Sequence, residues 1–328
     1  MKYIIAFLFL LVLPSKSQSQ GALPPTFFEG KSMVLVSSDP SASPSLPWQA
    51  LADSLHSYLI AAGGDPVGYL ELEQVVLSKV RQAEYAKAFQ QRQIQQVVLI
   101  TRQKEKVSIH VAPLSGDANF ISTIGIASFS GKDWKEAGQQ VAAYGKSTKT
   151  KNLLVIEVPE FPSLGEKVAA NTNQKVFQRK PLNLEVFKLG IPLEGSAALI
   201  GPMSYYRYDL LGKNQEVFLA ELENQKKEIE EIFKQNYPHA FVWLTESRST
   251  QELINDQVQF VLVKASGRQG DLMRSFGLDP VTGEEANLMV VKYYINLLVR
   301  DEIYLGPSWD AAPNSSVALR QFLENLKK

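Results

Sequence analysis

Cysteine is absent from this chain of 328 residues, and histidine occurs only three times. The sequence therefore has no disulfide, no thiol for a lipid anchor, no cysteine nucleophile and no thiolate metal site. The histidines are His56, His110 and His239, and none lies in an HExxH pattern or close enough to another to form a recognised metal pair. We interpret all three as structural, at a solvent edge for His56 and facing water or a covering helix for His110. We expect no cofactor and no bound metal.

An excess of one charge is also lacking, because 34 basic residues balance 34 acidic ones. Binding of nucleic acid depends on concentrated lysine and arginine charge. We therefore expect no nucleic acid among the partners.

Long hydrophobic runs are scarce. The best run after the N-terminus, Leu288 to Val299, is interrupted by Lys292 and Asn296. Spanning a bilayer takes about 20 apolar residues. The sequence thus predicts no transmembrane segment once the N-terminal segment has been removed.

The N-terminus has the layout of a secretory signal peptide. Lys2 precedes ten apolar residues, Ile4 to Leu13, and a polar stretch with small residues follows. Ser17 and Ser19 occupy the small-residue positions for cleavage before Gln20. The alternative is an uncleaved anchor, for which ten apolar residues are short. We expect an exported, periplasmic or extracellular protein, whose mature chain has a net charge of −2 because Lys2 and Lys16 are lost with residues 1–19.

Helical and strand patterns alternate along the chain, which predicts an α/β fold of mixed sheets with helices packed on them. The clearest stretch runs from Leu70 to Pro113, where apolar spacing indicates a helix over Glu71 to Arg92 and strands over Val97 to Thr101 and Val107 to Ala112. The other expected helices cover residues 48–62, 134–145, 215–235, 250–256 and 315–327. The other expected strands cover residues 33–37, 66–70 as a short extended piece, 120–129, 153–158, 182–186, 197–200, 240–245, 258–264, 288–298 and 302–305. Residues 265–287 are expected to form a polar loop.

The expected order of elements occurs twice: strand, helix, strand, helix, three strands, helix. The matching landmarks are Met33 with Ala197, Trp48 with Phe218, Gln95 with Gln257, and Trp134 with Leu319. We expect an N-terminal α/β domain over residues 20–165, a linker over 166–180 and a C-terminal α/β domain over 181–328. Two related units would leave a cleft between them, whereas the alternative, one continuous mixed sheet, has no preferred site.

Local catalytic motifs do not occur. The chain has no GxSxG elbow and no SxxK serine, and its two Gly-Lys-Ser triplets lack the second glycine of a phosphate-binding loop. We therefore name no catalytic residue.

Two loops carry residues suited to binding. Tyr205, Tyr206, Arg207 and Tyr208 gather flat amphipathic rings around a planar cation, which suits stacking on a sugar or anchoring a protein. The alternative is that these tyrosines pack on a sheet.

The second loop runs from Gly267 to Arg274. It could present backbone amides and the guanidinium groups of Arg268 and Arg274 to an anion. The alternative is that these arginines are simply solvated.

Our leading interpretation is a non-enzymatic exported binding or assembly protein of the cell envelope, whose partner is an envelope protein or glycan. The rival is a hydrolase of envelope glycans or peptides that uses paired carboxylates, which leave no local motif. The candidate acids are Asp209, Asp279, Glu284 and Glu285.

Overall fold

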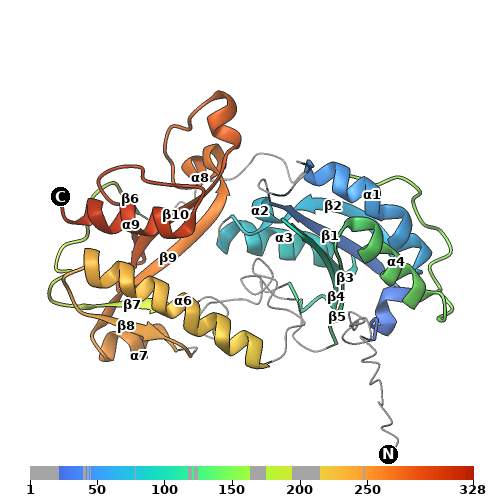
Figure 1. The fold of residues 1–328 in the computed structure, drawn as a ribbon, viewed down its shortest axis with the longest axis horizontal. Coiled ribbons are helices and arrows are strands. Elements are labelled where there is room, and N and C mark those ends of the chain that lie inside the picture. The colour runs from blue at the N-terminus through green and yellow to red at the C-terminus, as the bar shows by residue number, and fades with distance from the viewer. Residues whose placement is uncertain are drawn as a thin grey trace, which may run out of the picture.

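The computed structural model describes residues 22–39, 42, 44, 46–77, 79–116, 120–121, 125–162, 175–193, 215–246 and 248–328. It contains two mixed sheets with helices packed on them, which confirms the predicted α/β class (Figure 1). We call the described residues between 22 and 162 unit 1 and those between 175 and 328 unit 2. None of the helices in these ranges has both the length and the apolar character that crossing a membrane requires.

Unit 1 is a five-stranded sheet between two helical layers. Its strands lie in the order β2-β1-β3-β4-β5. Their bounds are β1 Lys31–Ser38, β2 Asp65–Glu71, β3 Ile94–Gln103, β4 Lys106–Pro113 and β5 Ala127–Gly131. β1 is parallel to β2 and β3, and β4 is antiparallel to both of its neighbours.

Two helices cover each face of this sheet. One face packs against α1 (Trp48–Ala61) and α4 (Trp134–Gly145), whose buried Leu55 and Val141 join one core cluster. The other face packs against α2 (Leu72–Val75) and α3 (Lys79–Gln91), whose Val75 and Phe89 belong to a second cluster. The strands are buried on both sides, which explains the continuous apolar run in β3.

Unit 2 has a six-stranded sheet in the order β6-β11-β10-β9-β7-β8. The strand bounds are β6 Val176–Phe177, β7 Lys188–Pro192, β8 Phe241–Leu244, β9 Val258–Arg268, β10 Met289–Leu297 and β11 Glu302–Tyr304. Helices α6 (Gln215–Asn236) and α9 (Ser315–Leu326) supply Phe233 and Phe322 to the core on one face. The remaining short elements are η1 Pro25–Phe28 in unit 1, and α7 Thr250–Asn255, α8 Gln269–Ser275 and η2 Gly283–Asn287 in unit 2.

The two units repeat one topology. In unit 1, β1 lies between β2 and β3 and is parallel to both, and β4 and β5 follow antiparallel. In unit 2, β7 lies between β8 and β9 and is parallel to both, and β10 and β11 follow antiparallel, while β6, which precedes β7 in the chain, is an additional edge strand. A glutamine with positive φ directly precedes each of the matching strands β3 and β9: Gln93 at 58° and Gln257 at 64°. The strand order is therefore repeated as predicted, but the helix α8 lies between β9 and β10, whereas a short turn joins β3 to β4, and Gln93 rather than Gln95 matches Gln257. Ala197, the expected match of Met33, lies outside the described residues, and the strand of unit 2 that corresponds to β1 by its position in the sheet is β7.

Several predicted elements have different bounds. The helix expected over Glu71 to Arg92 is two helices, because Glu71 completes β2 and the chain turns at residues 76–77 between α2 and α3. The strand expected over 120–129 begins only at Ala127, and Phe120 has a φ of 60°, which is not an extended conformation. The loop expected over 265–287 is also wrong: β9 continues to Arg268, where it pairs with Met289 of β10, and α8 follows directly.

Two expected strands do not form. Residues 182–186 make turns in which Leu182 and Val186 are exposed. Residues 153–158 form an irregular segment with Leu153 and Leu154 exposed. Each run was apolar, but a strand also needs a neighbouring backbone to pair with, and the described residues place none beside either run. The strand expected over 197–200 lies outside the described residues.

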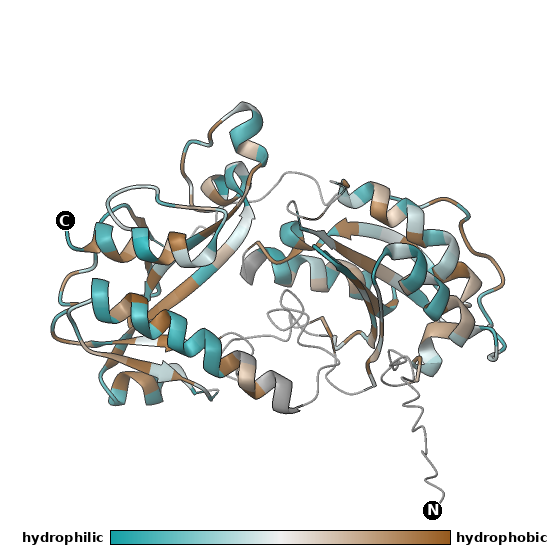
Figure 2. Cartoon of the chain, in the orientation of Figure 1, coloured by the Kyte–Doolittle hydropathy of each residue, from teal (hydrophilic) through white to brown (hydrophobic). Residues whose placement is uncertain are grey.

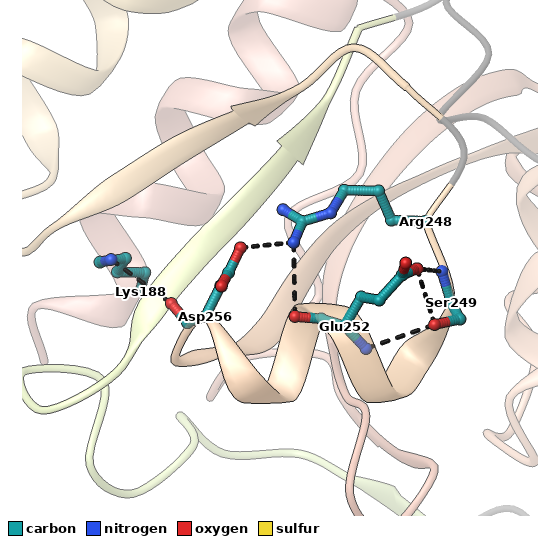
Figure 3. Close-up of polar contacts among 5 residues, drawn as sticks. All are labelled: Lys188, Arg248, Ser249, Glu252 and Asp256. Carbon is teal, nitrogen blue, oxygen red and sulfur yellow. Dashed lines mark hydrogen bonds and ion pairs between the residues drawn. The ribbon is translucent and has the colours of Figure 1, made fainter.

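Helix α7 shows how local sequence starts an element in unit 2. Ser249 accepts a hydrogen bond from the amide of Glu252, and the Glu252 carboxylate accepts one from the amide of Ser249 at 2.7 Å (Figure 3). This reciprocal pair satisfies two amides that the first turn leaves free. Arg248 forms an ion pair with Asp256 at the other end of the helix, and both side chains are well exposed.

Candidate functional site

A cleft lies where the two units meet. Its volume is about 490 Å³, and its lining comes from both units: Trp48, Gln49, Glu71 and Gln74 from unit 1, and Arg268, Asp271, Arg274, Ala286 and Asn287 from unit 2. Two of the predicted binding residues, Arg268 and Arg274, thus lie together in this cleft. The other predicted binding residues, Tyr205, Tyr206, Arg207 and Tyr208, lie outside the described residues.

An ion pair joins the units at the base of the cleft. Arg268, at the end of β9, donates from Nη2 to Glu71 Oε1 at 2.6 Å and from Nε to Glu71 Oε2 at 3.2 Å. The Glu71 side chain is 6% exposed and that of Arg268 is 29% exposed. The hydrogen bond to Glu71 raises the pKa of Arg268. This two-point contact fixes the end of β2 against the end of β9.

Apolar contact supports the same junction. A side chain added at Gly267 of β9 would place its Cβ 3.0 Å from Leu77 Cδ1 of unit 1. The backbone of β9 therefore passes close to the turn that follows α2. Glycine at this position allows the two units to approach each other.

Helix α8 forms one wall of the cleft. Arg274 forms an ion pair with Asp271 one turn earlier, and its side chain remains 60% exposed. The predicted loop was expected to present backbone amides to an anion, but one of them, that of Gln269, donates to the carbonyl of Leu288 at 2.9 Å. Of the two predicted residues that the structure describes, Arg274 is therefore the more open to a ligand, whereas Arg268 is bonded to Glu71.

The acids in the cleft are both engaged by guanidinium groups, Glu71 by Arg268 and Asp271 by Arg274. The predicted candidate acids Asp279, Glu284 and Glu285 are exposed on the segment between α8 and β10, and Asp209 lies outside the described residues. Across the described ranges, no set of three or more histidine, aspartate or glutamate side chains is arranged to hold a metal ion.

His56 and His110 are both buried. The prediction that His56 lies at a solvent edge is therefore wrong. For His110, the first of the two predicted environments, water, is also wrong. His56 lies between the Tyr69 hydroxyl, 2.8 Å from Nδ1, and the Ile156 carbonyl, 2.9 Å from Nε2. His110 Nδ1 is 2.8 Å from Ser128 Oγ on the neighbouring strand. Each ring thus forms hydrogen bonds to other segments of unit 1, which is a structural role.

Sequence reasoning missed a buried charged cluster in unit 2. Lys292 of β10 is completely buried, and it donates to the carbonyl of Leu305 at 2.7 Å and to the carboxylate of Asp310. Asn325 of α9 donates to the other oxygen of Asp310 at 2.9 Å. Burial lowers the pKa of Lys292, and the charge of Asp310 opposes that shift. The interruption of an apolar run by Lys292 was the only sequence signal for this cluster.

No family model, no curated protein and no solved structure matches the chain.

Proposed function

We propose that the chain is an exported binding or assembly protein of the cell envelope, and that its partner binds in the cleft between the two units. The observation that carries this proposal is that both units contribute exposed polar side chains to one open cleft. Export is supported by the signal-like N-terminal sequence, which ends before Gln20.

The chemistry of the cleft suits recognition. Gln49, Gln74 and Arg274 are exposed, so their amides and guanidinium can bond a partner without first leaving a buried position. Trp48 adds an aromatic surface at the start of α1. A flat ring beside amides and a cation suits a protein segment or a glycan that offers carbonyl, hydroxyl and carboxylate groups.

Hydrolysis by paired carboxylates is less well supported. A general acid must hold a proton near neutral pH, which requires burial away from cations. Glu71 and Asp271 instead contact guanidinium groups, and Asp279, Glu284 and Glu285 face water.

Capture from an envelope extract tests the proposal. The tagged mature protein, residues 20–328, is compared with Gln74→Ala/Arg274→Ala in the cleft and with Lys135→Ala/Gln139→Ala on the exposed side of α4. We expect the parent and the α4 variant to retain the same partner and the cleft variant to retain about tenfold less, since loss of one good polar contact changes affinity by about that factor.

Equal retention by all three proteins would remove the cleft from the proposal. A parallel Tyr206→Ala/Arg207→Ala variant separates the two predicted surfaces, because loss of the partner in that variant alone would assign binding to the tyrosine loop. Circular dichroism checks that each variant is folded. Release of reducing sugars or peptides from the extract by the parent would favour the hydrolase.

A further inference from the structure

Residues 146–158 of unit 1 display large apolar side chains to solvent. Leu153 is 85% exposed, Leu154 94% and Val158 67%. Figure 2 shows an apolar stretch next to a hydrophilic one in the segment that follows α4, on the side of unit 1 turned away from unit 2. Single exposed leucines are ordinary, but two adjacent leucines almost fully in water mark a contact surface.

A few hydrogen bonds attach the segment to the rest of unit 1. The Lys151 amide donates to the Phe28 carbonyl at 2.8 Å, and the Asn152 side-chain amide donates to the carbonyls of Phe27 and Gly63 at 3.1 and 3.0 Å. Further along, the Tyr69 amide donates to the Glu160 carbonyl at 2.8 Å. These bonds hold the backbone on both sides of Leu153 and Leu154, whose side chains face water.

Positive charge lies directly before the leucines. Lys146 and Lys149 are exposed, and Lys151 is exposed while paired with Glu29 at 2.7 Å. The acid of the segment, Glu157, comes after the leucines, as does Glu160 just beyond the segment. The end that carries Leu153 and Leu154 is therefore the positive end.

We propose that residues 146–158 dock unit 1 on an anionic lipid bilayer. The leucines enter the interface between head groups and acyl chains, and Lys146 and Lys149 bind lipid phosphates. Apolar side chains beside lysines are the combination by which peripheral proteins bind such surfaces. The charge of the lysines favours this occupant over a second copy of the chain, which would bring the same lysines together. The lipid-binding site is separate from the cleft, so this proposal and the proposed function can be tested independently.

Sedimentation with lipid vesicles tests the site. The mature protein is mixed with phosphatidylcholine vesicles, either pure or with about a third phosphatidylglycerol as the anionic lipid. We expect binding to the anionic vesicles alone. Leu153→Ser/Leu154→Ser should reduce that binding about tenfold or more, because the two leucines that enter the lipid interface are lost. Lys146→Gln/Lys149→Gln should reduce it about fivefold for each lysine.

The matched control is Leu182→Ser/Val186→Ser, which removes two exposed apolar side chains from unit 2 and should bind as the parent does. The proposal is overturned if the parent does not sediment with anionic vesicles, or if the leucine variant binds as well as the control. It is also overturned if the parent is a dimer in analytical ultracentrifugation that the leucine variant converts to monomer, because a second copy would then cover the leucines.

Discussion

Asp310→Ala is expected to lower the free energy of unfolding by about 3 to 5 kcal/mol, because it leaves a buried lysine without its carboxylate. Lys292 would remain between the rings of Trp309 and Phe322, whose centroids lie 5.8 and 4.8 Å from its Nζ. The side chains of Lys292 and Asp310 are 0% and 4% exposed, so water cannot replace the lost partner. Urea unfolding followed by circular dichroism measures the change.

Asp256→Ala provides the matched control, because it removes the partner of Arg248 from an exposed ion pair (Figure 3). Asp256→Ala is expected to lower the free energy of unfolding by about 1 kcal/mol or less. The double variant Lys292→Met/Asp310→Ala should lose less stability than Asp310→Ala alone, since it removes the uncompensated charge. A cost for Asp310→Ala equal to that of Asp256→Ala would contradict the burial of the Lys292–Asp310 pair.

Removal of Arg268 and removal of Glu71 should lower the free energy of unfolding by different amounts, although the two residues form one ion pair at the junction of the units. Arg268→Ala leaves Glu71, at 6% exposure, without the guanidinium that holds both of its oxygens, and we expect a loss of about 2 kcal/mol. Glu71→Ala leaves Arg268, at 29% exposure, next to the open cleft, where water can solvate it. We therefore expect a loss of about 1 kcal/mol for Glu71→Ala.

Urea unfolding of the two single variants measures this difference. Arg274→Ala serves as control, because it removes a second arginine from the same cleft, one that is 60% exposed and forms its ion pair within α8. Equal losses for Arg268→Ala and Glu71→Ala, or losses no larger than that of Arg274→Ala, would show that the ion pair does not hold the units together.

Regular apolar stripes were the part of the fold that the sequence could predict well. Leu319, Phe322 and Leu323 repeat at helical spacing and lie in the core as α9, and the hairpin of β10 and β11 turns near Arg300 and Asp301 as its pattern indicates. These elements depend on residues close in sequence, so the spacing of their apolar residues is enough to predict them.

Apolar runs without a stripe were predicted less well. Leu153 to Val158 has the composition of a buried strand, yet its backbone bonds to unit 1 only at scattered points and its leucines face water. The composition of a segment indicates what it can pack against, but the fold decides whether a neighbouring strand is available.

The candidate site could be predicted only in part. Arg268 and Arg274 were found from their residue type, but Glu71 was not, because its partner lies 197 residues away in sequence. Lys292 was noticed only as an interruption of an apolar run, whereas its value to the fold depends on Asp310 and Asn325 from other segments of unit 2. Contacts of this range leave no local pattern.

Site-specific photo-crosslinking from the cleft tests the central claim most directly. A photoreactive phenylalanine is placed at Gln74 in the cleft or, as control, at Gln139 on the exposed side of α4, and the cells are irradiated. We predict one discrete adduct with an envelope component from position 74 and none from position 139, and the adduct should fade when Arg274→Ala is added. The same adduct pattern from both positions would contradict a partner bound between the two units.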